Sequence, residues 1–135
     1  MKTLLDEHVD TGFKTALSAA GIAVFTVREM GWLGSKNGVL RAKMEAEGFK
    51  TLVTADKNMP FQQNLSNLNF AIVLMDTPSL SVKYQIQFLP KIQQFLAGEH
   101  DPLPKIVHVT VEGVSKGSKI EQLQKLVPPH DFLLL

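Results

Sequence analysis

The sequence has 135 residues, of which 44% are hydrophobic and 20% are charged, so it suits one globular domain with a core of useful size. The formal net charge is +1, which excludes a strong global field toward nucleic acid or anionic lipid. The absence of cysteine excludes disulfides, thiolate catalysis and cysteine-ligated zinc. We expect a cytoplasmic protein, because no apolar run approaches the roughly 20 residues that span a bilayer.

Short apolar runs that end at acidic residues or glycines alternate along the chain with helical patterns. The runs predict buried strands over residues 3–5, 22–27, 50–54, 70–75 and 106–111. Apolar residues at helical spacing predict helices over residues 9–20, 39–47 and 84–97. Pro90 lies inside the last of these patterns, where we expect a kink or a break.

This alternation predicts an α/β fold, a single domain with a parallel sheet of about five strands flanked by helices. We place that domain at residues 1–111. Residues 112–135 are expected to form a C-terminal extension with a short helix near residues 120–126. Its apolar end, Phe132–Leu135, would be costly in water, so we expect it to pack on its own domain or on a partner, such as a second copy.

Four acidic residues lie just after the ends of three of the expected strands. They are Asp6, Glu7, Asp56 and Asp76. The carboxyl ends of parallel strands share one edge of the sheet, and ligands bind there where the strand order reverses. Crowded carboxylates repel, and a hard divalent cation such as Mg²⁺ or Mn²⁺ relieves that repulsion. The sequence therefore predicts metal-dependent phosphodiester hydrolysis; the alternative is that these acids only occupy polar loops or cap helices.

Several short motifs together resemble those of PIN-like domains, which are relatives of VapC-type toxins. The chain begins Leu4-Leu5-Asp6-Glu7, and Thr54-Ala55-Asp56-Lys57-Asn58 resembles a later Thr-x-Asp motif. Residues 26–32, 36–38 and 60–65 are similar to a small bacterial branch of these proteins. The resemblance runs from Met1 to about Ala97, and its specificity lies in the order of the motifs.

The resemblance implies an acidic pocket that binds Mg²⁺ or Mn²⁺ and cleaves RNA, in a toxin with a small antitoxin partner. Asp6, Glu7 and Asp56 would then be catalytic. Asp6 and Asp56 would also hold the metal, together with Asn37 and Asn58. Both asparagines stand where related sequences carry acids, and an asparagine ligates through its carbonyl oxygen without adding charge. The implied alternative is a catalytically inactive PIN-like binding module.

A polar rim beside the acidic edge is a candidate for RNA binding. Its members are Trp32, Lys36, Asn37, Gln62, Gln63 and Asn64. Amides can bind phosphate, ribose or base edges, and Lys36 can neutralise a phosphate. Trp32 can stack on a base, a contact worth about 1–3 kcal/mol. The alternative is that Trp32 packs on the core and the amides stabilise turns.

A response-regulator receiver is a further alternative, with phosphorylation on Asp56. Asp6-Glu7 resembles its acidic pair, and Asp56-Lys57-Asn58-Met59-Pro60 resembles its Asp-x-x-Met-Pro turn. A receiver also needs a lysine at the carboxyl end of its fifth strand, whereas Lys105 precedes that strand. The histidines show no metal-ligand spacing. His8 lies close enough to Asp6 to be a pocket residue, but a surface role is expected for it, and His108 is expected to face solvent.

Overall fold

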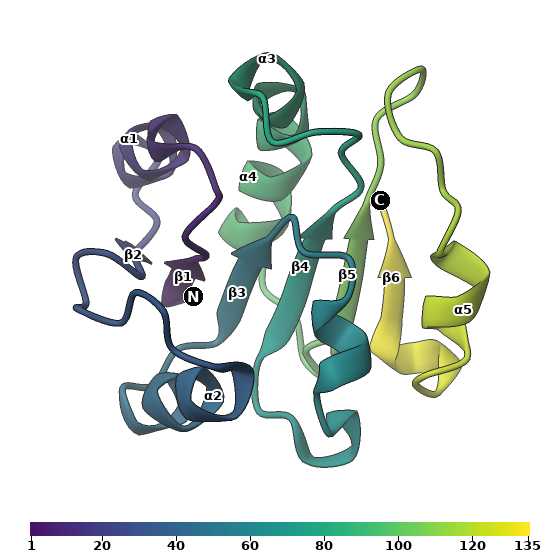
Figure 1. The fold of residues 1–135 in the computed structure, drawn as a ribbon, viewed down its shortest axis with the longest axis horizontal. Coiled ribbons are helices and arrows are strands. Elements are labelled where there is room, and N and C mark those ends of the chain that lie inside the picture. The colour runs from purple at the N-terminus through teal and green to yellow at the C-terminus, as the bar shows by residue number, and fades with distance from the viewer.

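A computed structural model describes residues 1–135 as a sheet of six strands, all parallel (Figure 1). The strands are β1 (Thr3–Leu5), β2 (Val24–Thr26), β3 (Thr51–Thr54), β4 (Ala71–Met75), β5 (Ile106–Val109) and β6 (Phe132–Leu134). Their order is β2-β1-β3-β4-β5-β6. The predicted α/β class and parallel sheet are confirmed. The predicted number of strands is one too few, because the apolar segment near Leu133 pairs with β5.

Helices and helical turns connect the strands. They are α1 (Thr11–Ala19), α2 (Asn37–Ala46), α3 (Val82–Gln85), α4 (Leu89–Ala97) and α5 (Ile120–Gln124), with the 3₁₀ turns η1 (Met59–Gln62), η2 (Leu65–Asn67), η3 (Ile86–Phe88) and η4 (Pro129–Asp131). The pattern over residues 84–97 breaks into α3, η3 and α4. Pro90 lies in the first turn of α4, where its missing N–H leaves no helical bond unmade.

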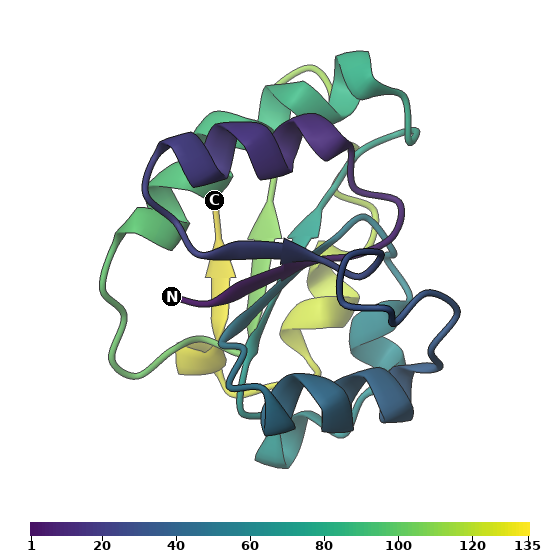
Figure 2. The ribbon, with the colours of Figure 1, turned by 90° about the vertical axis from the view of Figure 1, so that its left-hand side faces the viewer.

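Alternate residues of each strand face opposite sides of the sheet and build two separate cores. Leu5, Val53 and Val73 pack with α1 and α4 in a cluster of 16 buried residues. Leu4, Leu52 and Ile72 pack with α2 and with η1 and η2 in a cluster of 13. Figure 2 shows α1 and α4 above the sheet and α2 below it.

The crossover connection between β4 and β5 has an unusual handedness. The chain moves in the same direction along the sheet from β3 to β4 and from β4 to β5. The first step passes η1 and η2 on the α2 face, whereas the second passes α4 on the α1 face. The two crossovers therefore have opposite hands, and the β4–β5 crossover is left-handed, which is rare in parallel sheets.

The strand order reverses between β1 and β3. The chain leaves β1 toward α1 on one face of the sheet and leaves β3 toward η1 on the other. Diverging connections of this kind open a crevice at the carboxyl ends of the two strands, which is where doubly wound sheets bind ligands. Asp6 directly follows β1, and Asp56 lies two residues after β3.

None of the helices in the structure combines the length and the apolar character that a membrane span requires.

Candidate functional site

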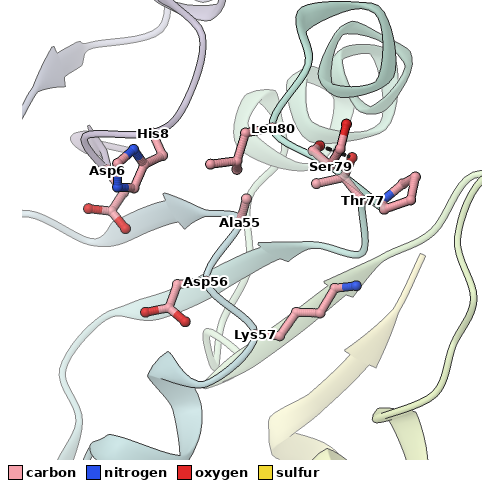
Figure 3. Close-up of a pocket in the computed structure, with 9 residues that line it drawn as sticks. Asp6, His8, Ala55, Asp56, Lys57, Thr77, Ser79 and Leu80 are labelled. Carbon is pink, nitrogen blue, oxygen red and sulfur yellow. Dashed lines mark hydrogen bonds between the residues drawn. The ribbon is translucent and has the colours of Figure 1, made fainter.

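A pocket of about 430 Å³ lies at the carboxyl ends of β1, β3 and β4 (Figure 3). It is lined by Asp6, His8, Ala55, Asp56, Lys57, Thr77, Pro78, Ser79 and Leu80. Because these residues come from the ends of three neighbouring strands, the pocket occupies the crevice where the strand order reverses. The structure therefore brings the two predicted metal-binding aspartates into one pocket.

A buried hydroxyl holds the Asp6 carboxylate in place. Thr54 at the end of β3 is fully buried, and its Oγ1 donates a hydrogen bond of 2.7 Å to Asp6 Oδ2. The other oxygen, Oδ1, accepts a 2.9 Å bond from the backbone N–H of Glu7. The Asp6 side chain is half-buried, so it keeps an orientation set by β3 while remaining open to the pocket.

The same hydroxyl also orients the loop that carries Asp56. Thr54 Oγ1 accepts a 3.0 Å hydrogen bond from the backbone N–H of Asp56. Asp56 Oδ1 then accepts a 3.0 Å bond from the N–H of Asn58, which makes an Asx turn of the kind that aspartate favours. One threonine therefore links the two aspartates, one through its carboxylate and the other through its backbone.

Neither aspartate has a basic partner. The ion pairs within 4.0 Å include neither Asp6 nor Asp56. Lys57 lines the pocket, but its ammonium lies 3.2 Å from Asp76 Oδ1. The pocket therefore holds two carboxylates that form no ion pair with a lysine or arginine of the chain, and an arrangement of this kind favours a cation.

Asp76 lies at the same edge of the sheet, as expected, but its carboxylate has partners that those of Asp6 and Asp56 lack. Its Oδ2 lies 3.0 Å from His108 Nε2 and accepts a 2.9 Å bond from the N–H of Gly117. Burial raises the pKa of Asp76, but the bonds from His108, Lys57 and Gly117 outweigh it and hold the pKa below its usual value. His108 is 1% exposed, so the expectation that it faces solvent is wrong.

Glu7 and His8 lie beside Asp6 but contribute differently. Glu7 is exposed, its side chain is not among those that line the pocket, and it supports Asp6 only through its N–H. His8 does line the pocket, and its carbonyl oxygen is fixed by a 2.8 Å bond from Gln85 Nε2. The imidazole is therefore the one side chain of this pair available to a bound ligand.

The two asparagines proposed as metal ligands are engaged elsewhere. Asn58 Oδ1 accepts a 2.9 Å hydrogen bond from Lys119 Nζ, and Asn37 Nδ2 donates to Gln62 Oε1. Neither lines the pocket, and no group of three histidine, cysteine, aspartate or glutamate side chains could hold a metal. The ligands that the pocket offers a hard cation are the carboxylates of Asp6 and Asp56, with water filling the other positions, as Mg²⁺ commonly accepts.

The remaining candidates for RNA binding lie outside the pocket. Trp32 is half-buried and packs edge-to-face on Phe49, with ring centroids 5.8 Å apart, so its ring contributes to the core. Asn64 Oδ1 accepts bonds from the N–H and hydroxyl of Ser66. Lys36 is exposed at the start of α2, and Gln63 is half-buried.

Two threonines of the site were not predicted as site residues, although Thr54 belongs to the Thr-x-Asp motif. Thr54 precedes Asp56 at a spacing that lets a strand-end hydroxyl reach the next loop, so its role was open to prediction. Thr77 follows β4 on the same edge, and its position was equally readable. No local signal indicated that Pro78, Ser79 and Leu80 close the pocket, because their place depends on how the chain enters α3.

Comparisons of the chain with protein-family models, with curated proteins and with solved structures found no match. The geometry of the pocket is therefore what indicates its function. The features that bear on it are the crevice between β1 and β3, the pair of carboxylates without basic partners, and the threonine that connects them.

Proposed function

We propose that the protein is a Mg²⁺- or Mn²⁺-dependent ribonuclease of the PIN-like kind, which hydrolyses RNA phosphodiesters in the pocket of Asp6 and Asp56. The observation that carries the proposal is that these carboxylates share a pocket at the reversal of strand order and have no basic partner. Two acidic oxygen donors in a water-accessible pocket fit a hard divalent cation. Such an ion would lower the pKa of a bound water and stabilise charge on the phosphoryl oxygens.

The chain's own residues would then position the substrate. Asp6 and Asp56 would hold the ion, with the first oriented by the buried hydroxyl of Thr54. His8 faces the same pocket and carries a group able to donate or accept a proton in hydrolysis. Lys57 forms an ion pair with Asp76, so its ammonium does not compete with the metal ion for the carboxylates of Asp6 and Asp56.

The test is cleavage of single-stranded RNA by the purified protein at millimolar Mn²⁺. Cleavage is expected for the parent and for Glu99→Gln, a control that removes an exposed acid outside the pocket. It is expected to be lost in Asp56→Asn, which keeps the side-chain oxygen but removes the charge. Cleavage that survives in Asp56→Asn, or a parent that cuts no RNA, would reject the proposed activity.

The proposal includes a role as the toxin of a toxin–antitoxin pair, with a small antitoxin protein as partner. Support for this role is the resemblance of the opening motif and of the Thr54–Asp56 motif to those toxins. Expression of the parent should then arrest growth, and expression of Asp56→Asn should not. Equal growth with both would contradict the toxin role.

An inactive binding module is the alternative supported by the engaged asparagines. Asn58 binds Lys119, and Asn37 binds Gln62. Neither asparagine therefore adds an oxygen ligand to the two carboxylates of the pocket. If millimolar Mn²⁺ changes neither the melting temperature nor the RNA, this alternative is favoured, since a ligand that binds only the native state must raise stability.

A second candidate is phosphorylation of Asp56 in a receiver-like domain. The order β2-β1-β3-β4-β5 is the one that receivers share with flavodoxin, and Thr77 lines the same pocket as Asp56. Against it, the ammonium of Lys105 binds the carbonyls of Leu65 and Ser66 at the opposite edge of the sheet. Incubation with acetyl phosphate and Mg²⁺, followed by mass measurement, decides: a phosphate lost in Asp56→Asn supports a receiver.

A further inference from the structure

An exposed aromatic ring and an unpaired cation lie together beside the pocket. Phe61 in η1 is 41% exposed, although phenylalanine is usually buried. Lys119, which directly precedes α5, places its ammonium 5.5 Å from the centroid of that ring. The same ammonium donates the 2.9 Å bond to Asn58 Oδ1. The half-buried lysine therefore lies over one face of a partly exposed ring, so that the ring and the cation share one place on the surface.

A short chain of hydrogen bonds connects this place to the acidic pocket. Asp56 Oδ1 accepts from the N–H of Asn58, and the carbonyl of Asn58 accepts a 3.0 Å bond from the N–H of Phe61. The side-chain oxygen of Asn58 then holds Lys119. Asn58 therefore sets the ring and the cation relative to the carboxylate that would hold the metal.

Lys119 is positioned by a fixed segment rather than by a free loop. The N–H of Gly117 binds Asp76 Oδ2 at 2.9 Å, and the hydroxyl of Ser115 binds the Asp76 carbonyl at 2.7 Å. No carboxylate lies within 4.0 Å of the Lys119 ammonium. Its charge is therefore held in place and left without a counter-charge.

We propose that Phe61 and Lys119 form a nucleotide subsite, in which Phe61 stacks on an unpaired base and Lys119 binds a phosphate next to the one at the Asp6–Asp56 pocket. This inference rests on the proposed function and adds to it the two side chains that would hold the nucleotide next to the cleaved phosphodiester. A base must be out of a duplex to lie on an aromatic face. A basic group that follows the backbone beside a stacking ring is the usual arrangement for binding single strands.

The charges of the pocket and of Lys119 have opposite signs, so only Lys119 favours a phosphate when no metal ion is present. The uncompensated carboxylates repel a phosphate unless a metal ion is bound, whereas Lys119 attracts one at all times. The subsite should therefore bind a single strand without any metal ion. This separates binding at Phe61 and Lys119 from hydrolysis at Asp56.

The test measures binding of a fluorescent, cleavage-resistant 2′-O-methyl RNA by anisotropy in EDTA. Phe61→Ala should weaken binding by about 5- to 150-fold, the range that corresponds to loss of one base–aromatic stack. Phe61→Tyr should restore it. Lys119→Met should lower the dependence of log Kd on log salt by about 0.7, as expected for one lost phosphate contact on a single strand.

Matched controls are Leu33→Ala, which removes another exposed apolar side chain, and Lys125→Met, which removes a lysine at the end of α5 that is 75% exposed. Both should bind like the parent. On an oligomer without bases, Phe61→Ala should have no effect, while Lys119→Met should keep its effect. An effect of Phe61→Ala on that oligomer would contradict stacking.

The subsite and the nuclease fail in different ways. RNA cleavage that depends on Asp56, with binding unchanged in Phe61→Ala and Lys119→Met, would overturn the subsite and leave the nuclease. Binding that both substitutions weaken, without cleavage, would support the subsite and overturn the nuclease. A parent protein that neither binds nor cleaves single-stranded RNA would overturn both.

Discussion

The Asp6–Asp56 pocket and the Asp76 network occupy the same edge of the sheet, and their carboxylates have opposite surroundings. Asp6 and Asp56 line an open pocket and have no basic partner. Asp76 is 2% exposed and bonded to Lys57, His108 and Gly117. All three acids directly or closely follow parallel strands. A place at the carboxyl edge therefore does not by itself assign a function. What distinguishes the two regions is that the Asp76 carboxylate has basic partners, whereas those of Asp6 and Asp56 have none within 4.0 Å.

The largest expected effect is on stability when Asp76 loses its charge. Asp76→Asn removes the buried anion that the partly exposed Lys57 and the buried His108 share, so the free energy of unfolding should fall by about 3–5 kcal/mol, or the melting temperature by roughly 10–20 °C. Asp56→Asn is the matched variant and should change the metal-free melting temperature little. Similar losses in both variants would remove the distinction between the two regions.

Acid should weaken the same network. The pKa of Asp76 is lowered in the native state, so its stabilising contribution is complete above the unfolded-state pKa and is lost as the pH falls toward the native one. The difference in unfolding free energy between the parent and Asp76→Asn should therefore be constant near neutral pH and shrink below about pH 4. Urea unfolding of both proteins across this range measures it; a constant difference through the acid range would contradict the shift.

A divalent ion should act only on the pocket. At 100 times its Kd, Mn²⁺ should stabilise the parent by about 2.7 kcal/mol, seen as a higher melting temperature. Asp6→Asn should abolish that gain and slightly raise the metal-free melting temperature, because one repulsion is relieved. Glu99→Gln should keep the full gain. A variant at Asp6 that responds to Mn²⁺ like the parent would exclude a shared metal site.

The smallest expected effect tests the hydroxyl that connects the two aspartates. Thr54→Val keeps the shape of a fully buried side chain and removes its bonds to Asp6 and to the Asp56 N–H. A hydrogen bond to a charged group contributes about 1.5–3 kcal/mol, so we expect a loss of about 2 kcal/mol and a higher Kd for Mn²⁺. Thr51→Val, at another buried threonine of β3, serves as the control and should leave the Mn²⁺ Kd unchanged.

Much of the fold was predictable because its signals are local. Five strands and the alternation with helices follow from apolar runs and their spacing, and Pro90 marks the break between α3 and α4. The sixth strand, Phe132–Leu134, was not predicted, because its apolar run at the end of the chain was expected only to pack on the domain or on a partner. It is defined by pairing with β5, which is a long-range contact.

The residues of the site also differ in whether their place follows from local signals or from long-range contacts. Asp6 and Asp56 could be placed together from the sequence because each closely follows a strand and parallel strands end on one edge. The pairing of Asp76 could not, because Gly117 lies 41 residues away and reaches it only through the fold. Nor could the engagement of Asn58 by Lys119, which is separated from it by 61 residues.

The left-handed β4–β5 crossover has a consequence for synthesis on the ribosome. Because η3 and α4 lie on the face of α1, Phe88 of η3 and Ile92 and Phe95 of α4 pack on that side of the sheet with Val73 and Met75 of β4. The opposite face is mostly covered by residues 40–70, which emerge earlier. A nascent chain that ends before α4 would therefore expose Val73 and Met75 on one side of a half-built sheet, and this is the stage at which a chaperone would bind it.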